Sequence, residues 1–349
     1  MGEIFNTELL IVGALFLFWM LLKAFSNSKN SEKIKKIYLL VVFVGLFILL
    51  SKRALVSDSI RYAERFHYLS SCSWKEFFAY DWEILYKIIN RVIGFFTDDE
   101  RIFLNIISVF SLIGPYVYIR NNSKNYMISC MFYVAIGSFG LNNYILRQSL
   151  ALSFILVGIE FLKNKKVKYY IIFSVLAFLI HTSSVMSLLV LPIYYTKEEN
   201  KPKIMLVIGI ILFIFKNLIV QYLAKILDYE GYIGSVHGYA NSGYVILAIL
   251  ILIMIAHLLI DKEKSIEKED SIKMTESLVY SCIMLHILGT ANAIIGRGAD
   301  TFSDSTGILA SYLVDNRRIE NNKIIAVIEV IMIIAHAIFA PALNGFVFM

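Results

Sequence analysis

Long apolar runs separated by short charged clusters are the feature that most constrains the fold of this 349-residue chain. Apolar and aromatic residues make up 58% of it and charged residues only 17%, whereas soluble domains are about half apolar and a quarter charged. Since a membrane-spanning helix needs about 20 apolar residues, the chain has room for about 12 spans and little else. A soluble fold is excluded, and we expect an all-α, polytopic transmembrane helical bundle.

The apolar runs predict helical segments within a single integral membrane domain over residues 1–349. The segments are 8–25, 36–51, 102–119, 126–142, 148–162, 168–181, 184–195, 203–222, 244–260, 274–295, 302–314 and 324–340. The first run lacks a small-residue cleavage site and precedes a basic cluster. We therefore interpret it as a retained span rather than a signal peptide.

Residues 168–195 decide the predicted topology. One continuous helix of this length would reach about 42 Å, whereas the hydrocarbon core is about 30 Å thick. A break at residues 181–184, His-Thr-Ser-Ser, instead makes a hairpin and leaves the basic loops on either side of it on the same face of the membrane.

The basic residues then predict the orientation. With both termini extracytoplasmic, most of the 33 Lys and Arg residues fall in inner loops, as the positive-inside rule requires. The two large outer loops are 52–101 and 223–243. In the first, aromatic and apolar residues from Trp74 onward recur at spacings of one, three and four, which predicts an interfacial amphipathic helix. A helix packed on the ends of the spans fits this pattern equally well.

Three ionisable residues, Arg147, His181 and Arg297, fall at the outer ends of their segments, where other basic residues are rare. Such groups are costly to desolvate, and they usually face a water-filled cavity or a partner. Short spans that meet there predict a recessed cavity open to the extracytoplasmic side. The alternatives are that the arginines extend to lipid headgroups and that the histidine is only hydrogen-bonded to a carbonyl.

These residue types point to an anionic ligand. A guanidinium donates two parallel hydrogen bonds to phosphate or pyrophosphate, and a histidine near neutrality can act as a base. A phosphate-binding glycine loop, a nucleophile elbow and metal-ligand spacings of His or Cys are all missing from the sequence. We therefore expect neither a cofactor nor a metal ion, and we expect no nucleic-acid partner. Lys216, within an apolar run, is expected to pair with backbone carbonyls or a carboxylate.

Residues 144–195 resemble a known family. Tyr144-Ile-Leu-Arg147-Gln148-Ser-Leu-Ala151, an apolar span, a basic loop and Phe178-Leu-Ile-His181-Thr-Ser-Ser184 are similar to the EpsG family of Wzy-type polysaccharide polymerases. Weaker similarity extends over about residues 50–315, through Asp58-Ser-Ile-Arg61-Tyr62 and the surroundings of Arg297.

The resemblance implies a GT-C-like membrane glycosyltransferase of the bacterial cytoplasmic membrane, acting in O-antigen, capsule or exopolysaccharide assembly. It implies that undecaprenyl-pyrophosphate-linked repeat units are joined at the outer leaflet, with release of lipid pyrophosphate. Partners would be these lipids, membrane lipids, and a flippase and chain-length regulator of the same pathway.

Carried over by position, the resemblance makes His181, Arg147 and Arg297 the catalytic residues. The expected substrate-binding residues, including two in the second outer loop, are Asp58, Arg61, Tyr62, Gln148, Tyr232 and His237. His237 is an alternative base to His181.

Two other functions compete with a polymerase. A flippase for lipid-linked oligosaccharides would also need arginines, but it should show mid-membrane charges and internal repeats, which are missing here. A polysaccharide acyltransferase would need its histidine on the inner side.

Overall fold

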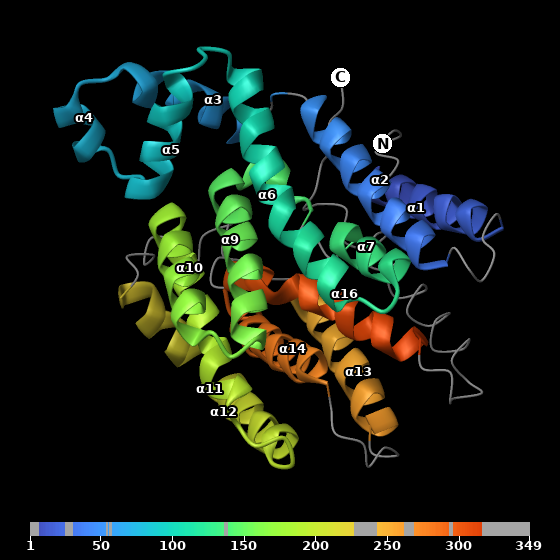
Figure 1. The fold of residues 1–349 in the computed structure, drawn as a ribbon. Coiled ribbons are helices and arrows are strands. Elements are labelled where there is room, and N and C mark those ends of the chain that lie inside the picture. Colours follow the sequence, from blue (N-terminus) through green and yellow to red (C-terminus); the bar gives the residue numbers. More distant parts are fainter. Residues whose placement is uncertain are drawn as a thin grey trace, which may run out of the picture. The chain divides into compact units, whose positions relative to one another are not determined.

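A computed structural model describes most of the chain. The described residues are 7–24, 31–53, 55, 58–135, 139–226, 243–261, 269–292 and 296–315. Every regular element among them is an α-helix or a 3-10 helix (Figure 1). The all-α prediction is confirmed. Its physical basis is that a helix satisfies its own backbone hydrogen bonds, which lipid cannot do.

Three helices in this part of the chain are long and apolar enough to cross a membrane. They are α2 (Ser31–Ser51), α6 (Glu100–Asn122) and α12 (Lys201–Ile226). Several shorter apolar helices accompany them. The total of about 12 spans, the GT-C-like arrangement and the recessed cavity stay predictions, and the segment 324–340 lies outside the described residues.

The predicted segments up to residue 314 each correspond to a helical stretch. Besides those above, the helices are α1 (Thr7–Ala24), α7 (Tyr126–Ala135), α8 (Leu141–Tyr144), α9 (Leu146–Lys163), α10 (Val167–Ile180), η2 (Thr182–Leu189), α11 (Val190–Tyr194), α13 (Gly243–Asp261), α14 (Asp270–Gly289), η5 (Arg297–Ala299) and α16 (Asp300–Asp315). At segment 126–142 the described residues belong to α7 and, after residues 136–138, to the four-residue α8.

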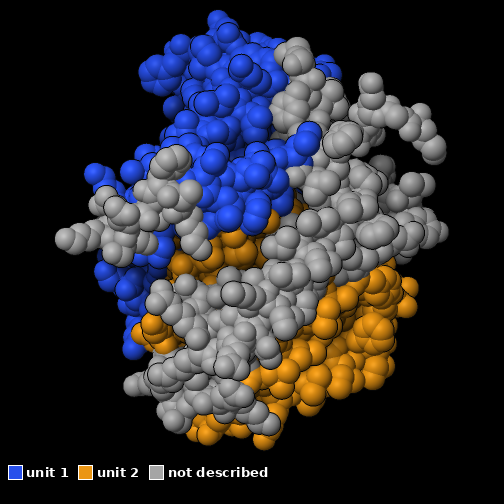
Figure 2. Space-filling model, turned by 90° about the vertical axis from the view of Figure 1, so that its right-hand side faces the viewer, with its two compact units in different colours: residues 1–121, 137–185, 341–349 blue, residues 122–136, 186–340 orange. Residues whose placement is uncertain are grey.

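The contacts divide the chain into two compact units, which Figure 2 colours separately. Unit 1 comprises residues 1–121, 137–185 and 341–349, and unit 2 comprises residues 122–136 and 186–340. That they act as one integral membrane domain stays a prediction.

In unit 1, α9 and α10 pack as an antiparallel pair. The Phe161 ring lies 5.3 Å from the Tyr169 ring, and Phe154 lies 6.2 Å from Phe173. As the residue number falls on one helix it rises on the other, so the start of α9 and the end of α10 lie at the same end of the pair.

The break after α10 is confirmed. The helix ends at Ile180, and His181 adopts an extended conformation with φ −156° and ψ 120°. The hydroxyl residues that follow compete for backbone hydrogen bonds and so favour helix ends. The chain then continues as η2 and α11, which leaves the amide of Thr182 outside any α-helix.

The segment 52–101, predicted to be an outer loop, contains three helices, α3 (Asp58–Ser71), α4 (Trp74–Ala79) and α5 (Ile84–Gly94). The single amphipathic helix expected from Trp74 onward is therefore interrupted at residues 80–83. Helix α5 contacts α3 and α10 and buries Tyr86, Lys87 and Asn90. Its opposite face exposes apolar side chains, so packing accounts for only one side of the helix, and its place at the membrane interface stays a prediction.

In unit 2, α12 and α14 run parallel. Lys201, the first residue of α12, donates to Ser277 Oγ in the first half of α14 at 3.1 Å. Lys216, further along α12, donates to Thr290 Oγ1, just after α14, at 2.9 Å. This pairing agrees with the predicted alternation of the spans, whereas the end that faces the cytoplasm stays a prediction.

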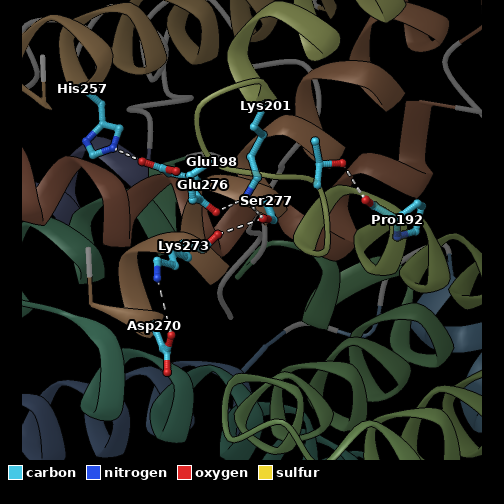
Figure 3. A network of polar contacts seen from close by, with 9 residues as sticks. Pro192, Glu198, Lys201, His257, Asp270, Lys273, Glu276 and Ser277 are labelled. Carbon is cyan, nitrogen blue, oxygen red and sulfur yellow. Dashed lines mark hydrogen bonds and ion pairs between the residues drawn. The ribbon is translucent and has the colours of Figure 1, made fainter. Parts of the chain in front are cut away.

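Helix α13 runs opposite to both and joins α14 through a buried polar pair. His257 Nε2, near the end of α13, lies 2.5 Å from Glu276 Oε1, which is only 2% exposed (Figure 3). Lys201 lies beside this pair, between Glu198 and Ser277. The side chain of His257 is thus paired with a buried carboxylate.

Replacing Glu276 with alanine should destabilise the protein by about 1–3 kcal/mol, because it leaves the buried imidazole without its partner. Thermal unfolding in detergent measures this as a lower midpoint. Lys273→Ala is the control, since Lys273 pairs with Asp270 only at 4.0 Å and both are partly exposed. Equal midpoints for the two variants would contradict the role of the buried pair.

Candidate active site

Arg147 and His181 lie at the same end of the α9–α10 pair. Arg147 is in the first turn of α9, which begins where Ile145 leaves helical geometry. His181 is the first residue after α10. Both side chains are mostly buried. The antiparallel packing therefore brings together two residues that are separated by two helices in the sequence.

A carboxylate that the sequence analysis missed joins them. Glu83 Oε2 lies 2.5 Å from Arg147 Nη1, and Glu83 Oε1 lies 3.2 Å from His181 Nδ1. The same Oε1 accepts from the backbone N–H of Thr182 at 3.0 Å. The Glu83 side chain is only 11% exposed, and it contacts both the start of α9 and the residues that follow α10.

The loop 80–83, between α4 and α5, positions Glu83. Lys87 Nζ donates to the carbonyl of Tyr80 at 2.7 Å, which fixes the start of the loop. The Trp82 ring packs 5.4 Å from Tyr62 and 5.5 Å from Tyr86. These contacts explain the interruption of the predicted helix, since the loop turns Trp82 and Glu83 toward α9 and α10.

Trp82 also contacts the arginine directly. The guanidinium carbon of Arg147 lies 4.8 Å from the centre of the Trp82 ring, a cation–π arrangement. Arg147 Nε has no hydrogen-bond partner among the described residues. This nitrogen is buried, and the guanidinium interacts with Tyr62 as well as with Glu83.

The charges around Glu83 keep it ionised. Burial by itself raises its pKa, but the hydrogen bond with His181 and the positive charge of Arg147 outweigh burial and lower the pKa to about 2. For Tyr62, burial raises the pKa of the phenol and the charge of Arg147 opposes that shift. At neutral pH the site thus holds a carboxylate, a guanidinium and a neutral phenol.

Glu83 should stabilise the fold only where it is ionised. A carboxyl group whose pKa is lower in the folded state adds stability above its ordinary pKa, and this is lost as the pH falls through the folded-state value. With values of 4.5 and about 2, wild type should unfold at a higher temperature than Glu83→Gln at neutral pH. This difference in unfolding temperature should narrow as the pH drops below 4.5. Scanning fluorimetry tests this, and a gap independent of pH would contradict it.

The remaining sequence-predicted residues are distributed as follows. Tyr62 lies in the site, against Trp82. Gln148 is buried next to Arg147 in α9. Asp58 and Arg61, on the helix of Tyr62, form an exposed ion pair at 3.9 Å. Tyr232 and His237 lie outside the described residues.

Arg297 lies in unit 2, exposed at the start of η5. Gly296, which precedes it, packs against Gly289 at the end of α14, and a Cβ on Gly289 would come within 2.8 Å of the Gly296 Cα. The Gly-Arg-Gly sequence thus allows the close approach of η5 to α14. Within the described residues, no cluster of three or more His, Cys, Asp or Glu side chains could hold a metal ion.

The family model of EpsG matches residues 36–345. The chain belongs to the EpsG family. This confirms the family resemblance, which was most specific over residues 144–195, and extends it beyond residues 50–315. No curated protein and no solved structure matches the chain. EpsG membership and the apolar helices together indicate a membrane protein of polysaccharide biosynthesis, with a polymerase-type function.

The EpsG resemblance located Arg147 and His181 but could not locate Glu83. A mostly buried arginine needs a compensating charge, so a carboxylate was to be expected. The segment 52–101 contains several acidic residues, including Glu76, Asp81 and Glu83, and nothing in the local sequence distinguishes one of them.

Proposed function

We propose that this EpsG-family protein is a polymerase that joins undecaprenyl-pyrophosphate-linked oligosaccharide repeat units at the outer leaflet of the bacterial cytoplasmic membrane. It transfers the growing glycan to the incoming unit and releases lipid pyrophosphate. The observation that carries the proposal is the bridge by which Glu83 joins Arg147 to His181.

The bridge orients the histidine as a base. Because a carboxylate only accepts hydrogen bonds, the proton between Glu83 and His181 belongs on Nδ1, which leaves Nε2 as the acceptor. This division of roles between a carboxylate and an imidazole is the one used in hydrolase triads. Glu83 is in this view a positioning residue, and His181 is the group that takes the proton.

In the proposed step, Nε2 of His181 takes the proton of an acceptor sugar hydroxyl. The hydroxyl oxygen forms a bond to the anomeric carbon of the donor glycan, and the bond from that carbon to the pyrophosphate oxygen breaks. Arg147 stabilises the charge on the departing pyrophosphate. The pyrophosphate leaves with the electron pair of the broken bond, and no nucleotide sugar takes part.

The proposal also gives roles to the other sequence-predicted residues. Arg297 is a second pyrophosphate ligand, and Asp58, Arg61, Tyr62, Gln148, Tyr232 and His237 line the substrate site. Aromatic rings such as Trp82 and Tyr62 are suited to stacking on sugars. The proposed topology places both termini and the site on the extracytoplasmic side, where the lipid-linked units are presented. A flippase and a chain-length regulator of the same pathway are the proposed protein partners.

The decisive experiment incubates the purified full-length protein with a synthetic lipid-pyrophosphate repeat unit and no nucleotide sugar. A ladder of products supports a polymerase. Transfer of the unmodified unit across a liposome bilayer, without a ladder, would instead identify a flippase and overturn the proposal.

A further inference from the structure

Helices α4 and α5, which lie next to α3 in Figure 1, carry an apolar face that the described residues leave uncovered. Its side chains are 43% to 84% exposed, and they belong to Trp74, Phe78, Ile88, Val92, Phe95 and Phe96. We call these residues the apolar face. Ile88, Val92 and Phe95 recur at intervals of four and three residues, so they form one stripe along α5. The opposite side of α5 is buried, with contacts to α3 and α10.

Arg91 joins the helices at the edge of the apolar face. Its guanidinium carbon lies 4.6 Å from the centre of the Trp74 ring in α4. The same guanidinium donates to the carbonyls of Leu69 and Cys72, at the end of α3, at 2.9 and 2.8 Å. Trp74 in turn stacks on Phe78, with ring centres 6.0 Å apart. One side chain thus connects α3, α4 and α5, so the apolar face and the loop between α4 and α5 belong to one packed structure.

The contact of α5 with α10 limits how far this face can lie from the membrane. The exposed Lys166 and Lys168 keep the start of α10 at a membrane boundary. The 14 residues of this apolar helix reach about 21 Å, whereas the hydrocarbon core is about 30 Å thick. His181, just after α10, lies 3.2 Å from Glu83, the N-cap of α5. Helix α5 therefore begins at or below headgroup depth.

The chemistry of the face suits lipid. Tryptophan and phenylalanine are typical of the apolar side of interfacial helices, and cations at its edge attract anionic headgroups. Here Arg91 and the exposed Lys75 supply those cations. Helix α10 also exposes an apolar stripe, which includes Val175 and Phe178 and faces lipid in a membrane protein.

We propose that the lipid surface of the membrane binds the apolar face of α4 and α5, and that this contact holds Glu83 between Arg147 and His181. Because Glu83 is the N-cap of α5, a tilt of α5 away from the lipid moves its carboxylate away from both partners. The lipid contact is independent of the proposed function, whereas its effect on the reaction rests on that function.

Spin labels on introduced cysteines measure the lipid contact. The full-length protein is reconstituted in nanodiscs of phosphatidylethanolamine and phosphatidylglycerol. The three native cysteines are buried, so the labels attach to the introduced ones. Phe95→Cys and Phe96→Cys place a label on the apolar face, and Glu64→Cys, at an exposed position of α3, is the matched control.

On the apolar face, labels should be more accessible to oxygen, which dissolves in lipid, than to a water-soluble nickel chelate. The Glu64→Cys label should show the reverse. Equal accessibility at all three positions would overturn the inference. Spin–spin broadening at Phe95→Cys would mark a second copy of the chain on this face and would overturn it too.

Charged substitutions test the effect on Glu83. The double variant Phe95→Asp/Phe96→Asp should lower the rate of ladder formation in nanodiscs by about 10-fold, because carboxylates do not enter the lipid surface. The conservative variant Phe95→Leu/Phe96→Leu should restore the rate. In a Glu83→Gln background the two aspartates should cause no further loss. Additive losses, or a wild-type rate from the aspartate variant, would overturn the coupling to Glu83. A lower unfolding midpoint of that variant in detergent would reveal a packing role for the two rings and would also overturn it.

The two measurements separate this inference from the proposed function. Labels in lipid, without any ladder from wild type, would refute the polymerase but keep the lipid contact. A normal ladder from wild type, with the Phe95→Cys and Phe96→Cys labels in water, would refute only the lipid contact.

Discussion

Replacement of Arg147 with alanine should abolish polymer formation while the protein remains inserted in the membrane. The guanidinium is the group that meets charge on the departing pyrophosphate, and loss of one such donor costs about 10²- to 10³-fold in rate. Polymer length on gels, compared with protein level in the membrane fraction, measures the effect. Wild-type polymer lengths from an Arg147→Ala strain with normal protein levels would disprove the role.

A stability effect must be separated from this loss, because Arg147→Ala also leaves the buried Glu83 carboxylate without its arginine partner. The double variant Arg147→Ala/Glu83→Gln removes that unpaired charge, and it should regain protein level but no polymer. Arg147→Lys keeps the charge without the planar fork and should be partly active at most. Arg120→Ala, which alters an exposed arginine of α6, is the control expected to polymerise normally.

Replacement of Glu83 with glutamine should lower the polymerisation rate by about 10²-fold or more, within the range for general-base catalysis. A neutral amide does not compensate the charge of Arg147. Arg147 and His181 both donate hydrogen bonds to residue 83, and the amide offers them one oxygen acceptor and an N–H donor in place of two oxygens. Initial rates of ladder formation with purified protein measure the effect. Glu100→Gln is the matched control, since Glu100 also pairs with a histidine, His67, but at an exposed position.

A double-mutant cycle tests whether Glu83 acts through His181. If it does, the double variant Glu83→Gln/His181→Ala should be no slower than His181→Ala alone. Once His181 is removed, Glu83 has no histidine to position, so its replacement causes no further loss of rate. Additive losses would show that Glu83 acts independently, through Arg147. If His181→Ala keeps near-normal activity while His237→Ala loses it, the base is His237 of the second outer loop.

The helices and the break after α10 were predictable because they depend on local properties. Apolar length makes a helix in lipid, and the run of hydroxyl residues after His181 ends one. The structure of the segment 52–101 was harder to predict. Its periodicity continues through residues 80–83, yet the loop there is held open by Lys87 and by packing of Trp82 against Tyr62 and Tyr86, contacts that periodicity does not encode.

The sequence by itself determined the all-α membrane class, the family, and the presence of Arg147 and His181 at one end of a helix pair. These follow from composition, from run length and from residues close together along the chain. Only the tertiary structure decided that Glu83 connects them, and that the partners of Lys216 among the described residues are hydroxyl groups. The physical reason is that charge compensation acts through space: a buried cation requires a partner, but its place in the sequence is set by how distant helices and loops pack.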